Sequence, residues 1–138
     1  MNKVLSVRWH GPIALFPIDA LHPTEEHCED RVQEVMKSIS SSGDWTRLIA
    51  VEKHFRIVMD GHHRLEAARR LGFDFVPCAA LTYSEVRVES RRPNLAVSDK
   101  EIIRRGLNKD LYPIKSTRHI FPVSFVLDCQ LPIKLLKA

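Results

Sequence analysis

The sequence predicts a single α+β domain that spans residues 1–138 and combines short strands with amphipathic helices. Short runs rich in apolar and β-branched residues recur along the chain and indicate strands. Elsewhere, apolar residues recur at spacings of three and four, which indicates helices that bury one face. A chain of 138 residues is long enough to enclose one hydrophobic core.

Composition and charge exclude several classes of protein. Apolar residues make up 44% of the chain and charged residues 28%, as in ordinary globular proteins. We find no apolar run long enough to cross a bilayer and no signal peptide, so we expect a cytoplasmic protein without a membrane partner. The cysteines at positions 28, 78 and 129 form no CxxC pair, which argues against a disulfide framework or a zinc site. A net charge of +4 allows a polyanionic ligand and does not require nucleic acid.

The N-terminal part of the chain predicts one strand and one helix. Residues 13–18 are apolar, and Pro17 favours a sheet edge or a strand end. Thr24 is expected to cap a helix whose first turn contains Glu25 and Glu26. The helix is expected to end within residues 40–43, Ser-Ser-Ser-Gly, after a buried face formed by Val32, Val35, Met36 and Ile39.

Two strands then lead into residues 60–64, the sequence Asp-Gly-His-His-Arg around which the chain is organised. Residues 48–52 and 55–59 are expected to pair antiparallel across a short polar turn. Residues 65–71 continue as a helix, and Gly72 stops it. The first two residues of the 60–64 stretch therefore form a tight strand-to-helix turn, and its three basic residues occupy the first helical turn.

This turn has the chemistry of an anion site. The first turn of a helix has unpaired N–H groups at the positive end of the helix dipole, and Gly61 lets a bulky anion approach the backbone. Two imidazoles and the Arg64 guanidinium add donors for phosphate oxygens. Asp60 can either cap the helix or hold a Mg²⁺ that bridges phosphates. The alternative is a capped helix with a solvated, cationic first turn.

The second half of the chain predicts further strands, a third helix and a polar loop. Ser98 and Glu101 have the spacing of a capping box, which opens the helix. Residues 91–94 are expected to form a turn, and residues 112–119 a loop dense in hydrogen-bond donors. Three strands are expected, at residues 75–81, 86–90 and 125–129.

Residues 60–64 resemble the phosphate-binding motif of the ParB/sulfiredoxin superfamily. Within it, free-serine kinases carry Asp-Gly-His-His-Arg, as this chain does, whereas chromosome-partitioning ParB proteins carry Gly-Glu-Arg-Arg. Sulfiredoxins have their catalytic Cys at the position of His62, so this chain lacks that nucleophile. The resemblance covers residues 13–122 and implies a compact α+β domain with a small mixed sheet flanked by helices.

Two further segments resemble the free-serine kinases. Residues 23–26, Pro-Thr-Glu-Glu, match the segment whose carboxylate contacts the substrate hydroxyl, with Glu25 in the better register. Ser38 matches a serine on the helix that follows, and the Lys-x-Thr-Arg-His run at 115–119 matches a segment that closes over the amino acid and its phosphate. Without the resemblance, these would be helix-start acids and a polar loop. Arg91 stands where these kinases carry a Trp that lines the substrate pocket, so the acceptor stays open.

The resemblance implies phosphoryl transfer from ATP or ADP, with Mg²⁺, to the hydroxyl of free L-serine or a related hydroxy amino acid, giving O-phosphoserine. It assigns a catalytic role to Glu25, Asp60 and His63, and Asp60 is the implied metal ligand. Nucleotide binding is assigned to Ser38, Asp60, Gly61, His62, His63 and Arg64. Substrate binding is assigned to Glu25, Arg91, Lys115, Thr117, Arg118 and His119.

Two other functions are alternatives to free-serine kinase activity. A ParB-like nucleotide- or DNA-binding regulatory module would share the motif, but such proteins append a helix-turn-helix domain, and the residues after 122 are too few to form one. A haem- or metal-sensing regulator would use the seven histidines, but His62 and His63 are helix neighbours and do not share a face. We therefore expect no specific nucleic acid partner, and the sequence does not indicate an oligomeric state.

Overall fold

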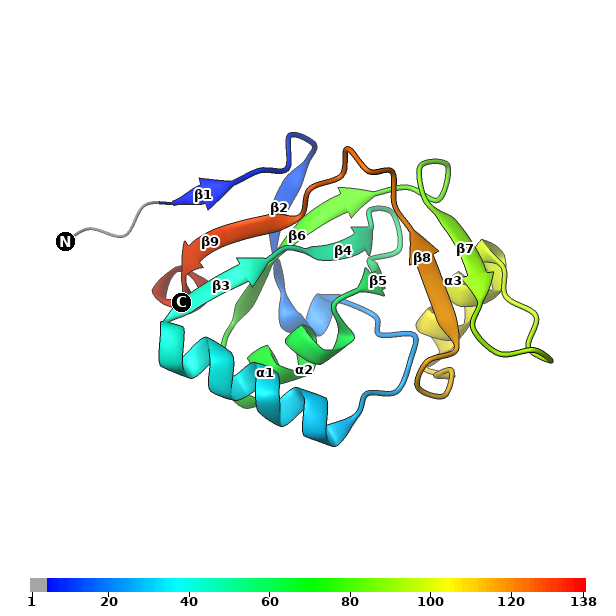
Figure 1. Ribbon diagram of the computed structural model, residues 1–138, viewed down its shortest axis with the longest axis horizontal. Helices are drawn as coiled ribbons and strands as arrows, with labels where there is room; N and C mark the ends of the chain where they lie inside the picture. The colour runs from blue at the N-terminus through cyan, green and yellow to red at the C-terminus, as the bar shows by residue number, and fades with distance from the viewer. Residues whose placement is uncertain (1–4) are drawn as a thin grey trace.

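A four-stranded mixed sheet occupies the centre of the molecule (Figure 1), for which the computed structural model describes residues 5–138. β6 runs antiparallel to β2 and parallel to β4, and β4 pairs antiparallel with β5. The mixed sheet and the predicted antiparallel pair are thus confirmed. In sheet order the strands are β2 (Ile13–Pro17), β6 (Phe75–Leu81), β4 (Ile49–Glu52) and β5 (Ile57–Asp60).

Two smaller sheets lie at opposite ends of the central sheet (Figure 1). At one end, β1 (Ser6–Val7), β9 (Asp128–Pro132) and β3 (Asp44–Arg47) form an antiparallel sheet with β9 in the middle. At the other end, β7 (Arg87–Ser90) and β8 (Thr117–Ile120) form an antiparallel pair. This second sheet becomes one wall of the candidate site.

Three helices pack against the sheets. α1 (Glu29–Ser42) and α2 (His62–Arg70) pack against each other, whereas α3 (Asp99–Asn108) contacts β5 and lies beside the β7–β8 pair (Figure 1). Two short 3₁₀ helices, η1 (Ile18–Ala20) and η2 (Ile133–Leu136), complete the described elements. The main core includes Trp45 and Ile49, and a smaller core of Ile57, Ile102 and Tyr112 lies under α3.

The segment before α1 differs from the prediction, which made Thr24 a helix cap. The helix begins at Glu29, with Cys28 as an N-cap that makes no side-chain bond, and Thr24 is fully buried. The Thr24 N–H donates to His62, and the Thr24 carbonyl accepts the Tyr112 N–H at 2.8 Å. A helix starting at Thr24 would break these backbone bonds, so the segment stays extended.

Other local predictions have mixed outcomes. Ser98 Oγ accepts the Glu101 N–H at 3.2 Å and caps α3 as predicted. Residues 117–119 were predicted as part of a loop but belong to β8, because this segment pairs with β7. The last strand lies at 128–132 instead of 125–129, and β5 begins at Ile57, after a turn that includes residues 55 and 56. β1 was missed because it has only two residues, and β3 was missed because its sequence, Asp-Trp-Thr-Arg, contains a single apolar residue and no apolar run.

Candidate functional site

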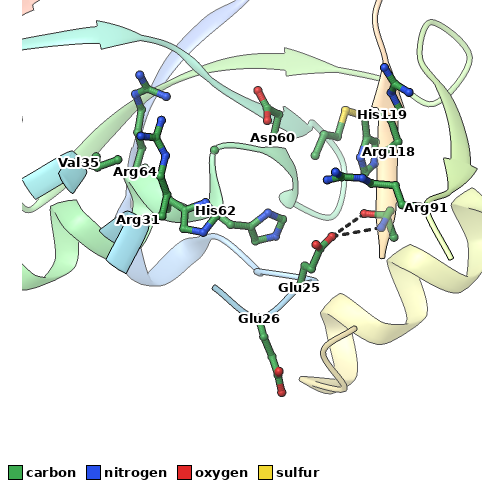
Figure 2. Close-up of a pocket in the computed structure, with 14 residues that line it drawn as sticks. Glu25, Glu26, Arg31, Val35, Asp60, His62, Arg64, Arg91, Arg118 and His119 are labelled. Carbon is green, nitrogen blue, oxygen red and sulfur yellow. Dashed lines mark hydrogen bonds between the residues drawn. The ribbon is translucent and has the colours of Figure 1, made fainter. Parts of the chain in front are cut away.

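A pocket of about 350 Å³ lies where three parts of the chain meet. These parts are the extended segment before α1, the turn from β5 into α2, and the β7–β8 pair, and Figure 2 shows their side chains around one space. The lining consists of Glu25, Glu26, Arg31, Val35, Met59, Asp60, Gly61, His62, His63, Arg64, Arg91, Thr117, Arg118 and His119.

The turn between β5 and α2 forms one wall. Gly61 is the N-cap of α2 with φ +110°, a conformation that favours glycine, and a Cβ there would lie 3.1 Å from Ile49 Cγ1. Glycine therefore lets α2 start close against β4 and leaves its first-turn N–H groups open to an anion. The alternative that Asp60 caps the helix is wrong, because no side chain caps α2, and the Asp60 carboxylate lies 3.5 Å from Arg47 Nε.

Arg31 and Arg64 bring two guanidinium groups to the same side of the pocket (Figure 2). Arg64 is partly buried, and no hydrogen bond or ion pair joins its guanidinium to another residue within 5–138. Burial and the nearby guanidiniums of Arg47 and Arg31 lower the pKa of Arg64. A partly buried cation without a direct partner favours a bound anion such as phosphate.

The two histidines of the motif are tied to the segment that carries Glu25. His62 Nε2 accepts the Thr24 N–H, and His63 Nε2 accepts the Cys28 N–H, each at 3.1 Å. Burial lowers the pKa of both rings, that of His62 to about 4, so both are neutral acceptors at pH 7. A neutral ring that accepts at Nε2 carries its proton on Nδ1. The two histidines therefore bind residues 24–28 to the start of α2. Each ring has one remaining hydrogen-bond donor, its Nδ1–H.

The Glu25 carboxylate faces the pocket, whereas Glu26, which is also a lining residue, directs its carboxylate away from the other side chains (Figure 2). Glu25 Oε2 accepts the Thr117 hydroxyl at 2.9 Å and the Thr117 N–H at 3.4 Å, and Oε1 accepts the Ser116 N–H at 3.2 Å. A carboxylate offers about four acceptor directions. These three hydrogen bonds fix the carboxylate against the start of β8. The carboxylate can accept one further hydrogen bond, from a ligand in the pocket.

The β7–β8 pair and the residue after β7 supply the third wall. The Arg91 side chain has no hydrogen bond or ion pair within residues 5–138 and extends toward the pocket (Figure 2). Arg118 is exposed, and its guanidinium lies 4.0 Å from the Glu89 carboxylate, at the outer limit of an ion pair. Burial lowers the pKa of His119 to about 4, so its ring is neutral. This wall therefore presents two cations and one neutral imidazole.

The pocket brings together most of the residues that the resemblance assigned to the site. Ser38 and Lys115 do not line it: Ser38 is exposed on α1, and Lys115 is exposed in the turn before β8. Arg31, Val35 and Met59 line the pocket and were missed by the sequence reasoning. Arg31 and Val35 lie four residues apart on one face of α1, but the α1 residue that the sequence assigned to the site, Ser38, does not line the pocket and so did not point to them.

Asp60 is the candidate ligand for magnesium. Its side chain is 47% exposed and lines the pocket. Within residues 5–138, no group of three or more His, Cys, Asp or Glu side chains is arranged to hold a metal ion by itself. Mg²⁺ is usually bound by one or two carboxylates together with phosphate oxygens. A single carboxylate beside an anion site therefore fits a metal that arrives with a nucleotide.

Known proteins with similar sequences include two serine kinases and a ParB-like protein of Sulfolobus acidocaldarius, which is 29% identical over 84 residues. The chain is 33% identical over 94 residues to the ATP-dependent L-serine kinase of Staphylothermus marinus. The matching region covers 64% of this chain and 36% of that protein. The chain is also 30% identical over 105 residues to the ATP-dependent L-serine kinase of Desulfurococcus mucosus, and this matching region covers 67% of this chain and 40% of that protein. The chain thus spans less than half the length of these relatives. No protein-family model matches it.

Solved structures identify the fold. A free serine kinase in complex with AMP superposes with a TM-score of 0.82 at 13% identity, over 99% of this chain and 98% of that chain. The chain therefore has the α+β fold of the free serine kinases, and the predicted ParB/sulfiredoxin-like fold is confirmed.

None of the helices within residues 5–138 is both long enough and apolar enough to span a membrane.

Proposed function

We propose that this chain is a free amino-acid kinase, which transfers a phosphoryl group from ATP or ADP to the hydroxyl of free L-serine or a related hydroxy amino acid. With serine the product is O-phosphoserine. One observation carries the proposal: the Glu25 carboxylate lies in the same pocket as the anion site built from Asp60, Gly61 and Arg64. This reaction needs a general base that accepts the hydroxyl proton and a site that binds the phosphates of the donor. We propose that residues 1–138 act as one catalytic domain.

Two of the named relatives support the same chemistry. Both are ATP-dependent L-serine kinases, and the solved enzyme with this fold holds AMP. The similarity covers about two thirds of this chain and less than half of each relative, so it bears on the part that they share. ATP is accordingly the first donor to test, and ADP the second.

The phosphates of the nucleotide bind, in this proposal, at the start of α2. The first-turn N–H groups and the Arg64 guanidinium contact phosphate oxygens, and Arg31 adds a second cation from α1. When bound, Mg²⁺ held by Asp60 neutralises part of the phosphate charge. The Nδ1–H groups of His62 and His63 are the remaining donors on this side of the pocket.

The acceptor binds between Glu25 and the β7–β8 wall. Arg91, Arg118 and His119 take its carboxylate or the transferred phosphoryl group, with Thr117 beside them. The acceptor oxygen forms a bond to phosphorus as the bond to the leaving nucleotide oxygen breaks, and the hydroxyl proton passes to Glu25. General-base action of this kind is worth about 10²–10⁴-fold in rate. We assign no contact to Ser38 or Lys115, which lie outside the lining.

The proposed partners are small molecules. The cationic groups of the site line a pocket of about 350 Å³, which suits a nucleotide phosphate and an amino acid better than a nucleic acid duplex. We therefore propose a cytoplasmic enzyme without a specific nucleic acid partner and without a membrane partner.

The direct test is to incubate the protein with Mg²⁺, either ATP or ADP, and one amino acid at a time, and to detect phosphoamino acids by mass spectrometry. We expect phosphoserine from L-serine. Absence of any phosphorylated product from serine, threonine or homoserine with both donors would overturn the proposal.

Glu25→Gln tests the assigned base. The substitution keeps size and most hydrogen bonding but removes the proton acceptor, so we expect kcat to fall about 10²-fold or more with little change in nucleotide affinity. Glu26→Gln is the matched control, because the Glu26 carboxylate points away from the other side chains of the pocket, and we expect near-normal turnover (Figure 2). The reverse pattern would assign the base to Glu26, and normal turnover of both variants would exclude a carboxylate base.

A further inference from the structure

Tyr83 contacts the candidate site from outside the pocket. It lies between β6 and β7, and its hydroxyl oxygen is 2.9 Å from His119 Nε2. The centroids of the two rings are 5.7 Å apart, and the ring planes are inclined to each other by 34°. His119 lines the pocket, whereas Tyr83 does not. The hydroxyl has no other hydrogen-bond partner within residues 5–138.

The direction of this hydrogen bond follows from protonation and from which of the two rings lines the pocket. Burial raises the pKa of the Tyr83 phenol and lowers the pKa of His119 to about 4, so at neutral pH the phenol keeps its proton and the imidazole is uncharged. Each direction leaves one donor without a protein acceptor: the Tyr83 O–H if Nε2 donates, or the His119 Nδ1–H if the phenol donates. His119 lines the pocket, where water or a ligand can accept from its ring, whereas Tyr83 does not line it, so an unbonded Tyr83 O–H is the less favourable outcome. The phenol therefore donates and Nε2 accepts.

We propose that Tyr83 is a positioning residue that holds His119 in its Nδ1–H tautomer, so that this imidazole offers an N–H donor to an anionic oxygen in the pocket. The anionic oxygen belongs to the acceptor carboxylate or to the transferred phosphoryl group, and that part rests on the proposed kinase function. The tautomer itself does not depend on the reaction.

The tautomer decides whether His119 attracts or repels such a ligand. An Nδ1 lone pair facing an anionic oxygen would repel it, whereas an Nδ1–H donates a hydrogen bond. The ring stays uncharged at neutral pH, so the donor is present without a third positive charge beside Arg91 and Arg118. Without Tyr83, neither tautomer is selected by a partner at Nε2.

Nitrogen NMR tests the tautomer without any activity measurement. In the ¹⁵N-labelled full chain at pH 7, we expect His119 Nδ1 to be protonated and Nε2 unprotonated. In Tyr83→Phe, which removes only the hydroxyl, we expect the resonances to move toward the Nε2–H form. A wild-type His119 in the Nε2–H form, or a tautomer unchanged in Tyr83→Phe, would overturn the proposal. The wild-type spectrum decides the tautomer even if the variant does not fold, and the kinetic comparison with Tyr112→Phe tests the role of Tyr83.

Kinetics test the consequence for the ligand, with Tyr112→Phe as the control. The Tyr112 hydroxyl is buried and has no hydrogen-bond partner within residues 5–138, so its removal breaks no such bond. We expect Tyr83→Phe to raise the acceptor KM roughly tenfold, the equivalent of one neutral hydrogen bond, with the nucleotide KM unchanged. Equal acceptor KM values for Tyr83→Phe and Tyr112→Phe would contradict the positioning role.

A double-mutant cycle separates positioning from a general effect on packing. His119→Asn places an amide N–H near the position of Nδ1 and does not need Tyr83 to select a tautomer. We expect Tyr83→Phe to have little further effect on the acceptor KM in the His119→Asn background. An equal additional loss in that background would mean that Tyr83 acts through packing. If no amino acid is phosphorylated at all, the kinase proposal fails, while the NMR result still decides the tautomer.

Discussion

His62, His63 and His119 all use Nε2 to accept a hydrogen bond from another part of the chain. The donors are the backbone N–H groups of Thr24 and Cys28 and the hydroxyl of a tyrosine. The imidazoles are therefore fixed in orientation and uncharged, and the positive charge of the site comes from its arginines. The histidines of the site, which the sequence suggested as cationic groups, are therefore neutral in the folded protein. Each is fixed in orientation and can donate a hydrogen bond from Nδ1.

The partial burial of His119, which lowers its pKa, predicts a dependence of stability on pH. Its folded pKa is about 4, below the ordinary value of about 6.5, so between those values the unfolded chain binds more protons than the folded one. The stabilisation is complete above pH 6.5 and is lost as the pH falls toward 4. We expect the contribution of His119 to decrease by about 1–2 kcal/mol between pH 7 and pH 5.

Urea denaturation at pH 7 and at pH 5 measures this effect. His119→Asn removes the titrating group, so its free energy of unfolding should change less between the two pH values than that of the wild type. An identical change in both proteins would show that His119 does not contribute to the acid sensitivity.

Residues near one another in the sequence were predictable, and their distant partners were not. The Asp-Gly-His-His-Arg stretch lies within one turn, so its spacing alone indicated a strand-to-helix anion site, and the structure places it there. The acceptors and donors that complete it come from elsewhere: 38 residues separate His62 from Thr24, and 36 separate His119 from Tyr83. No local pattern marks Tyr83, because its role depends on a contact across the fold.

At the scale of elements, the start of α2 depends on the absence of a side chain at Gly61. In Gly61→Ala, the positive φ and the close approach to the buried Ile49 act together, and we expect a loss of about 1–3 kcal/mol in unfolding free energy. The first-turn N–H groups would move as well, so nucleotide affinity should fall. Calorimetry and urea denaturation measure the two effects.

Gly72→Ala is the matched control for this substitution. Gly72 also has a positive φ, of +78°, but a Cβ there would meet no atom within 4 Å. We expect a smaller loss of stability and unchanged nucleotide affinity. Equal behaviour of the two variants would mean that the close contact with Ile49 is unimportant for the anion site.

Elements were predictable where a single segment determines its own conformation. The α3 cap at Ser98 and the β4–β5 pair follow from local patterns and are present. The start of α1 and the strand β8 were not predictable, because contacts with other segments override local preference. Residues 22–26 have acids and a Thr that favour a helix start, yet bonds to α2 and to Tyr112 hold them extended.

At the scale of the whole molecule, the pocket joins parts that rest on different cores. The start of α2 rests on the central sheet and the main core, whereas the β7–β8 wall lies beside α3 and the small core of Ile57, Ile102 and Tyr112. Ile57 belongs to β5, so the small core connects the acceptor wall to the central sheet. Because the phosphate side of the pocket rests on the main core and the acceptor side on the small core, the two sides should respond differently to packing defects.

Ile102→Ala tests this division. Ile102 is fully buried in the small core, so truncation should cost about 2–5 kcal/mol in unfolding free energy. The cavity lies under α3, beside the acceptor wall, and we expect the acceptor KM to rise more than the nucleotide KM. Leu136→Ala is the control, because Leu136 is equally buried but lies in η2 near the opposite end of the molecule (Figure 1). It should lose similar stability without a selective change in the acceptor KM. If both variants alter the two KM values alike, the cores do not support the two sides of the pocket separately.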